Sequence, residues 1–179
     1  VVLLLARLLN QKGIPEFVEI TKNVREKILD AQFLIAGEVD EEHPDAVQLD
    51  WLNSQKDIEY LGRLQDVREV LRNSDILLFP SYREGVPRAV LESSAMSVPA
   101  IGFDVPGVRE AIKDGETGFL YKFKDTEGMT CGVLELLNDA ALRLEMGKAA
   151  RKFVIEDFDI RSIEQKYIDV YSNQNLEIT

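Results

Sequence analysis

Short apolar runs alternate along the chain with longer amphipathic stretches, and this alternation limits the folds that the chain can adopt. The apolar runs predict β-strands at residues 1–6, 32–36, 58–61, 75–79 and 99–102, with a weaker strand at 118–121. Alternation of strands with helices along the chain favours a parallel sheet covered by helices on both faces. We therefore predict a Rossmann-like, three-layer α/β/α fold with about six parallel strands.

Helices are predicted where apolar residues recur every three to four positions. Residues 14–29 show this pattern, with Lys22, Arg25 and Lys27 outward; the expected inward residues are Ile14, Phe17, Val18, Ile20, Val24, Ile28 and Leu29. A helix over 66–73 has Asp66 as its candidate N-cap, and the next helix begins after Pro87. Three further helical segments, about 126–138, 140–156 and 159–173, follow without a strand and predict a helical C-terminal tail.

Composition narrows the class of protein. With 179 residues, 45% hydrophobic and 30% charged, the chain suits one globular domain, and its net charge of −11 argues against a nucleic-acid-binding surface. The single cysteine, Cys131, is expected to be buried on a helix in a protein from a reducing compartment. The single histidine, His43, lies in an acidic loop and is expected to be solvated. Because a predicted strand begins at residue 1 without a preceding cap, turn or polar segment, we expect the chain to be a piece of a longer protein.

Charged residues and glycines follow several predicted strands, at the sheet edge where such folds bind ligands. Arg7 and Lys12 follow the first strand, beside a helix N-terminus, and this combination suits a diphosphate, although surface cations are the alternative. Glu84 and Glu92 follow the fourth strand. They would lie about 12 Å apart by helical rise, too far to share a proton. They either hold different parts of one elongated ligand or are a chance pair in a chain with 32 acidic residues.

Five motifs, in order along nearly the whole chain, resemble glycosyltransferase family 4. They are Ala6-Arg7-Leu8 with Lys12-Gly13, Tyr60-Leu61-Gly62-Arg63, the segment from Tyr82 to Glu92, Val105-Pro106-Gly107-Val108-Arg109-Glu110, and Asp114-Gly115-Glu116-Thr117-Gly118-Phe119-Leu120. The resemblance is strongest to the bacterial branch that builds polysaccharides and lipid-linked oligosaccharides. It implies that residues 1–179 are the C-terminal, donor-binding domain of a GT-B enzyme whose N-terminal acceptor domain is separate.

The resemblance also implies roles for single residues. Arg7 and Lys12 would bind the diphosphate and stabilise the leaving group, Glu84 would contact the donor sugar, and Glu92 would bind the ribose hydroxyls. Gly62 and Arg63 would receive the nucleobase, while Gly85 and Val86 would turn backbone amides toward the sugar and phosphates. Pro87 has no N–H, so Arg88 or Ala89 must supply any amide contact there. Arg109 and Glu110 either pair with each other or contact the donor.

We therefore expect a retaining, metal-independent glycosyltransferase without a cofactor, using a nucleotide sugar, with UDP as the default. The acceptor would be a glycan or a polyprenyl-linked glycan, held by the N-terminal domain. We expect a cytoplasmic protein, free or peripheral at the inner membrane face, and an isolated chain that transfers nothing. A non-catalytic sugar-nucleotide-binding module or sensor on the same fold is the alternative.

Overall fold

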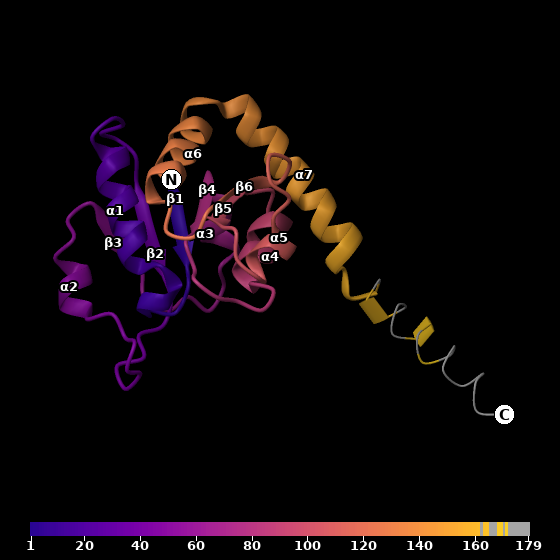
Figure 1. Cartoon of the computed structure of the whole chain (residues 1–179), viewed down its shortest axis with the longest axis horizontal. Coiled ribbons are helices and arrows are strands. Elements are labelled where there is room, and N and C mark those ends of the chain that lie inside the picture. Colours follow the sequence, from indigo (N-terminus) through magenta and orange to yellow (C-terminus); the bar gives the residue numbers. More distant parts are fainter. Residues whose placement is uncertain (162, 165–167, 170, 172–179) are drawn as a thin grey trace.

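The computed structural model describes residues 1–161, 163, 164, 168, 169 and 171. Its strands are β1 (Val2–Leu5), β2 (Phe33–Ala36), β3 (Ile58–Tyr60), β4 (Ile76–Phe79), β5 (Ala100–Phe103) and β6 (Gly118–Tyr121). Its helices are the 3-10 turn η1 (Asn10–Lys12), α1 (Ile14–Arg25), α2 (Leu49–Asn53), α3 (Arg68–Arg72), α4 (Arg88–Ala95), α5 (Val108–Ala111), α6 (Thr126–Asn138) and α7 (Ala140–Phe158). Figure 1 shows their arrangement.

All six strands are parallel and run in the order β3-β2-β1-β4-β5-β6. This confirms the predicted Rossmann-like sheet, and each predicted strand lies within one residue of an observed one. The strand order reverses between β1 and β4, which pair directly through Val2 with Ile76 and Leu3 with Leu77. A fold of this kind binds its ligands at such a switch point, beyond the carboxyl ends of the strands.

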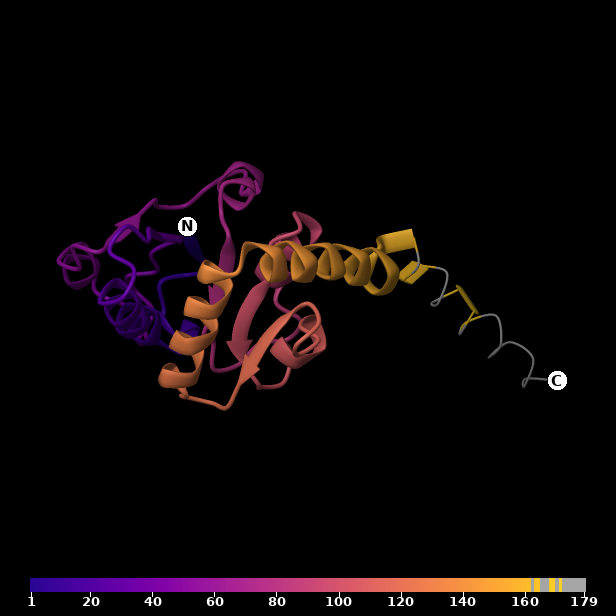
Figure 2. The same ribbon diagram turned by 90° about the horizontal axis from the view of Figure 1, so that it is seen from above.

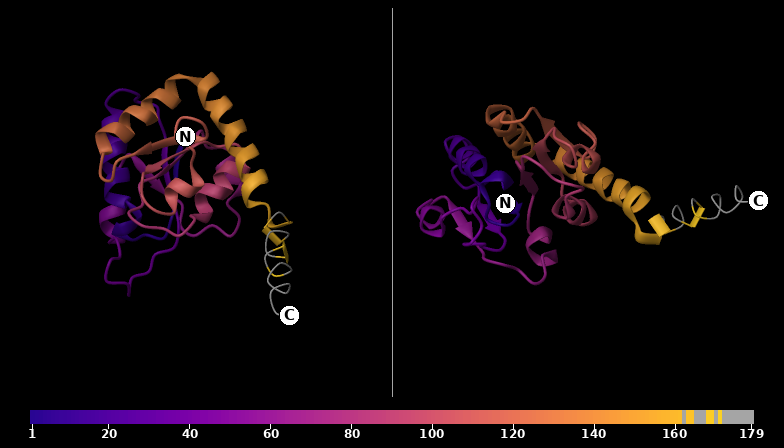
Figure 3. Two further views of the ribbon diagram at one scale, coloured as in Figure 1. Left: turned by 45° about the vertical axis from the view of Figure 1, so that its right-hand side comes forward. Right: turned by 60° about the horizontal axis from the view of Figure 1, so that its bottom comes forward.

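Helices cover both faces of the sheet, as predicted. On one face α1 packs beside α6, and on the other α4 packs against α7 and α5 (Figures 2 and 3). The right-handedness of β-α-β crossovers explains why α1 and α4 lie on opposite faces. The step from β1 to β2 and the step from β4 to β5 run in opposite directions across the sheet, so their connecting helices cover opposite sides. The α6–α7 pair then carries the chain from the first face to the second, and α7 extends beyond the body of the sheet (Figure 1).

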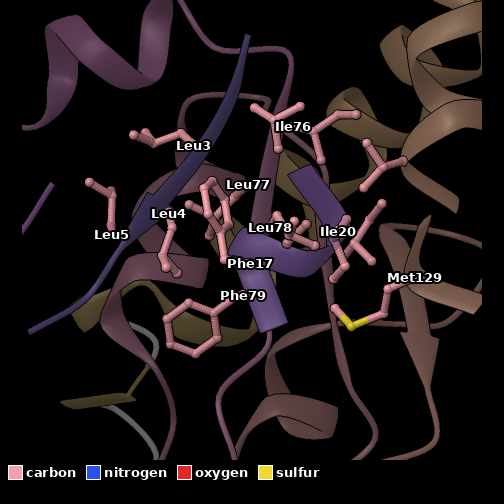
Figure 4. Packing of buried hydrophobic residues seen from close by; sticks show 14 of the residues in the cluster. Leu3, Leu4, Leu5, Phe17, Ile20, Ile76, Leu77, Leu78, Phe79 and Met129 are labelled. Carbon is pink, nitrogen blue, oxygen red and sulfur yellow. The ribbon is translucent and has the colours of Figure 1, made fainter. Parts of the chain in front are cut away.

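The core forms where β1 and β4 meet α1 and α6. Every residue of β1 and β4 is buried, which explains why these strands are continuous apolar runs instead of alternating ones. Phe17 of α1 packs edge-on against Phe33 of β2, with ring centroids 5.8 Å apart. Met129 of α6 is fully buried in the same core cluster (Figure 4). The last residues of both central strands, Leu5 and Phe79, are therefore packed in this core.

Helix α1 is shorter than predicted. It ends at Arg25 instead of continuing to residue 29, and the N–H of Lys27 already bonds the carbonyl of Val24 in a tighter turn. Ile28 still packs against the core, but Leu29 is 77% exposed. The chain turns away here to enter β2, so Leu29, although it continues the helical spacing, has no core to face.

The prediction for Cys131 was wrong, because its thiol is exposed on α6. The buried side of α6 is formed by Met129, Val133 and Leu136, and a residue two positions from Met129 lies about 200° around the helix. Helix α3 (Arg68–Arg72) is shorter than the predicted 66–73, and its N-cap is Val67 instead of Asp66. The Asp66 carboxylate accepts the Arg68 N–H from just outside the helix.

The C-terminal tail is helical, as predicted, through α6 and α7. Of the further helix expected over 159–173, the described residues 160, 161, 163, 164, 168, 169 and 171 are helical, and the other residues after 161 lie outside the described part of the chain. No helix in the described part of the chain is both long enough and apolar enough to cross a membrane.

Candidate functional site

Two loops meet at the switch point, one after β1 and one after β4. Gly13 adopts a left-handed conformation with φ of 76° between η1 and α1, and an added Cβ there would lie 2.0 Å from the carbonyl oxygen of Pro80. Only glycine allows this close approach. The N–H of Tyr82 also donates to the carbonyl of Gln11, 2.9 Å away. The two loops are therefore packed backbone to backbone.

This packing brings together Lys12 and Glu84, two residues that the sequence assigned to the site. Lys12 Nζ lies 2.6 Å from Glu84 Oε1, and the two side chains are only 16% and 15% exposed. The same carboxylate oxygen accepts a hydrogen bond of 2.8 Å from Ser81 Oγ. Ser81 is fully buried and was missed as a site residue. Its position in the loop that precedes Glu84 was the only available signal.

A second contact joins the same two segments. The hydroxyl of Tyr82 donates to Oε1 of Glu16, in the first turn of α1, and Glu16 is 9% exposed. Burial, followed by the hydrogen bond to Glu16, raises the pKa of Tyr82 far above its usual value. Neither residue was assigned a role from the sequence, because an acidic residue in a first helical turn ordinarily serves the helix dipole.

The loop between β5 and α5 closes another side of the site. Gly107 has φ of 85°, and an added Cβ would lie 1.6 Å from the carbonyl oxygen of Gly85. Arg109 and Glu110 do not pair with each other: Arg109 Nε lies 2.8 Å from Asp104 Oδ1, and Glu110 Oε2 accepts the N–H of Gly107 at 2.5 Å. Adjacent residues on a helix point about 100° apart, which explains why that alternative fails.

The other cations predicted for the site lie at its margins. Arg7 is 54% exposed, and its NH1 lies 3.7 Å from Oδ2 of Asp40, in the loop after β2. Arg63 is 70% exposed and pairs with Glu38 at 3.0 Å. Gly62 has φ of 73°, and its carbonyl accepts the N–H of Gly37. Arg7, Gly62 and Arg63 lie at the same carboxyl edge of the sheet as Lys12. The side chains of Arg7 and Arg63 remain exposed to solvent although each forms an ion pair.

In the acidic loop near Arg7, the prediction that His43 is solvated is not borne out. Glu41 and Glu42 are exposed, and His43 is half-buried, with its Nδ1 accepting the N–H of Asp45 at 3.1 Å.

A cleft of about 670 Å³ lies between the segment that follows β3, helix α3 and helix α4. It is lined by Leu64, Gln65, Asp66, Val67, Arg68, Leu71, Arg88, Glu92, Ala95 and Met96. Glu92 and Arg88 form an ion pair of 3.3 Å at its edge, with side chains 40% and 90% exposed. Hydrogen bonds from Arg68 hold the pKa of the Asp66 carboxyl down at about 2. The cleft has the size of a small-ligand site and contains two of the predicted donor-binding residues.

Glu84 and Glu92 thus occupy different parts of the site, as their spacing suggested. Glu84 stands in the loop against Lys12, outside the lining of the cleft, whereas Glu92 lines the cleft from α4. Gly85 and Val86 are exposed in the loop between them, and Pro87 is the N-cap of α4. An elongated ligand that reaches from the cleft to Lys12 would pass the N-terminus of α4, where the Arg88 and Ala89 amides begin the helix.

Acidic residues do not cluster as metal ligands in this part of the molecule. Among the residues that the structure describes, no group of three or more His, Cys, Asp or Glu side chains is arranged to hold a metal ion. The chain has one Asp-X-Asp spacing, Asp157 to Asp159, at the end of α7, and there Asp159 bonds Arg161.

Comparison with known proteins places these features in a family. The family model for glycosyl transferases group 1 matches residues 1–153. The chain is 36% identical over 171 residues to the N,N'-diacetylbacillosaminyl-diphospho-undecaprenol alpha-1,3-N-acetylgalactosaminyltransferase of Campylobacter jejuni, a match that covers 96% of this chain and 44% of the relative. The chain thus spans less than half the length of that curated relative.

Solved structures share the fold. Anabaena HepE in complex with UDP superposes with a TM-score of 0.86 at 17% identity, over 96% of this chain and 48% of that one. The C-terminal domain of LpcC, a glycosyl transferase group 1 family protein from Francisella tularensis, superposes with a TM-score of 0.76 at 23% identity, over 89% of this chain and 86% of that domain. With the family model spanning most of its length, the chain belongs to the glycosyl transferases group 1 family.

Proposed function

We propose that this chain is the C-terminal, donor-binding domain of a longer, retaining glycosyltransferase of family 4. The enzyme would transfer a sugar from a nucleotide sugar, with UDP as the expected nucleotide. The observation that carries the proposal is the contact of Lys12 with Glu84 at the switch point, beside a cleft lined by Glu92. A cation, a carboxylate and a cleft at this edge suit the diphosphate, the sugar and the nucleoside of one donor.

The chemistry of transfer matches these groups. Cleavage of the sugar–phosphate bond leaves an oxocarbenium-like sugar and a diphosphate with increased negative charge. Lys12 and Arg7, together with the first amides of α4, would meet that charge in place of a metal ion. Donors fixed in advance toward developing charge contribute strongly to catalysis, and loss of one commonly costs roughly 10²- to 10³-fold in turnover.

The two glutamates would hold opposite ends of the donor. Glu84 would accept from hydroxyls of the sugar, because its carboxylate lies beside the cation for the leaving group. Glu92 would accept from the ribose hydroxyls, because it lines the cleft in which the nucleoside would lie. Gly62 and Arg63 would receive the base, and Gly85, Val86 and Arg88 would line the path of the phosphates.

Names of similar proteins support the substrates. The Campylobacter relative is named for a diphospho-undecaprenol acceptor and an alpha linkage, the configuration that retention from an alpha-linked donor produces. HepE was solved with UDP. We therefore infer a glycan or polyprenyl-linked acceptor in cell-surface polysaccharide synthesis, held by a separate N-terminal domain. The match to the LpcC domain supports the C-terminal assignment. We infer a cytoplasmic location, free or peripheral at the inner membrane face.

A screen of nucleoside diphosphates by thermal shift, followed by transfer assays with the whole enzyme, tests the proposal. Specific binding of one nucleotide should raise the melting temperature, and the product should keep the anomeric configuration of the donor. Glu92→Ala should weaken UDP binding. Nucleotide binding without any turnover by the whole enzyme would instead indicate a binding module, and an inverted product would contradict the retaining mechanism.

A further inference from the structure

The loop that carries Glu84 has no regular structure of its own. It runs from Pro80 to Pro87, and Arg83, Gly85 and Val86 are exposed. If Glu84 contacts a sugar beside Lys12, something must hold this loop against the segment that carries Lys12. The backbone hydrogen bond from Tyr82 to Gln11 holds the loop at one point. The contact between Lys12 and Glu84 adds little to it, because a ligand that binds both groups competes with that contact.

Tyr82 and Glu16 supply a second link between the same two segments. Glu16 lies four residues after Lys12, in the first turn of α1, and Tyr82 lies two residues before Glu84. The phenol hydroxyl donates to the Glu16 carboxylate. The Tyr82 ring packs edge-on against Phe123, with centroids 5.1 Å apart, and Lys124 Nζ lies 5.6 Å from the Tyr82 centroid. A phenol keeps its proton across the physiological range even at the ordinary tyrosine pKa of 10.0, and the pKa of Tyr82 is raised above that value, so its hydroxyl remains the donor.

One atom of this link is expected to lower the stability of the fold. Glu16 is 9% exposed, and its second oxygen, Oε2, is buried without a hydrogen-bond partner among the described residues. A buried polar atom left unpaired ordinarily costs about 1–3 kcal/mol, and an apolar pair of the same shape avoids that cost. An arrangement that is unfavourable for folding, two residues from a proposed functional carboxylate, points to a role in the site.

We infer that Tyr82 and Glu16 are positioning residues, whose hydrogen bond ties the Glu84 loop to α1 and so sets the distance between the Glu84 carboxylate and the Lys12 ammonium. The inference rests on the proposed function. We call the Tyr82–Glu16 hydrogen bond the tether. It would act by positioning Glu84, because neither Tyr82 nor Glu16 belongs to the groups that would contact the donor. A misplacement of about 1 Å in a catalytic group can lower turnover by up to roughly 10²-fold.

The test uses the whole glycosyltransferase with its nucleotide-sugar donor. Tyr82→Phe keeps the ring that packs on Phe123 and removes only the hydroxyl. We expect kcat to fall roughly 10- to 100-fold while KM for the donor changes less than about threefold, because Lys12 and Glu92 remain. Glu16→Gln retains an oxygen that accepts from the phenol, and it should keep most of the activity. Tyr121→Phe, the same change on β6, is the matched control.

A double variant separates positioning from stability. Tyr82→Phe with Glu16→Leu removes both polar partners, so the melting temperature should return to that of the parent or exceed it. If the link positions Glu84, kcat of the double variant stays low although stability recovers. Recovery of kcat together with stability would show a purely structural role and overturn the inference, as would Tyr82→Phe at the parent rate.

The same experiment distinguishes the two proposals. A parent enzyme that turns over no nucleotide sugar refutes the proposed function, and the tether with it. A parent enzyme that is active, with Tyr82→Phe equally active, refutes the tether alone.

Discussion

Substitution of Glu84 by Gln should make UDP bind more tightly while turnover falls. Lys12 and Glu84 neutralise each other across 2.6 Å, so a diphosphate that binds Lys12 must lie beside a carboxylate. Glutamine has the same shape and can still accept from Ser81 Oγ, but it carries no charge. The variant therefore removes the electrostatic repulsion between Glu84 and the diphosphate of UDP. It also replaces a charged hydrogen-bond acceptor for the sugar hydroxyls with a neutral one.

The size of the effect follows from the geometry. A phosphate on the far side of the ammonium would lie about 5–6 Å from the Glu84 carboxylate, and one unit charge at that distance contributes roughly 0.8 to 3 kcal/mol for effective dielectric constants of about 80 to 20. This range corresponds to UDP binding that is roughly 4- to 150-fold tighter. Turnover should fall roughly 10²- to 10³-fold, because the carboxylate no longer supports the reacting sugar.

Isothermal calorimetry with UDP, at two salt concentrations, measures the first effect. Glu92→Gln is the matched comparison, since it lines the cleft and should shift UDP affinity in the opposite direction. Glu145→Gln, an exposed position on α7, makes the same change in net charge away from the site and should leave affinity unaltered. The gain in Glu84→Gln should shrink as salt rises. Equal or weaker UDP binding by Glu84→Gln would refute the reasoning.

Three further predictions concern the chain itself. Residues 1–179 alone should bind a nucleotide sugar weakly and transfer nothing, and radiolabelled product from this chain would contradict that expectation. Gly13→Ala should lower the free energy of unfolding by about 3 kcal/mol or more in urea titrations, because its Cβ would lie 2.0 Å from the Pro80 oxygen. Gly115 has φ of 73° and open space around it among the described residues, so Gly115→Ala should lower the free energy of unfolding by only about 1–2 kcal/mol. Burial, followed by nearby Glu135, raises the pKa of Tyr121 to about 12 from 10.0. The unfolded chain then loses this proton first, so stability should be intact below pH 10 and fall as the pH rises from 10 through about 12. Tyr121→Phe should make that decline shallower, and an unchanged slope between pH 9 and 12 would count against the assignment.

The order of strands and helices could be predicted because its signals are local. Continuous apolar runs in β1 and β4 indicate strands buried on both faces, and helical spacing in α1 and α6 indicates helices that bury one side. The errors lie where local spacing and three-dimensional packing disagree. Leu29 continues a helical pattern beyond the end of the helix, and Cys131 sits in an apolar stretch but faces solvent.

Arg7, Lys12, Glu84 and Glu92 were predicted as site residues from their places after strands, and the other candidates came from the family resemblance. The partners of these residues were not predicted. Arg109 lies next to Glu110 in the sequence, yet it bonds Asp104. Ser81 has no pattern that marks it as buried beneath Glu84, and the fit of Gly107 against Gly85 depends on where two loops cross. These relations depend on the tertiary path of the backbone, which no short window of sequence contains.

By itself, the sequence determined a parallel α/β sheet, the edge at which a ligand would bind, and the identity of Lys12, Glu84 and Glu92 as candidates. Only the tertiary structure decided that Lys12 meets Glu84 across 72 positions of the chain, and that Tyr82 meets Glu16 across 66. The physical reason is that periodicity is a property of neighbouring residues. The distance between two loops is set by how β1 and β4 pair and by how closely Gly13 lets the backbones approach.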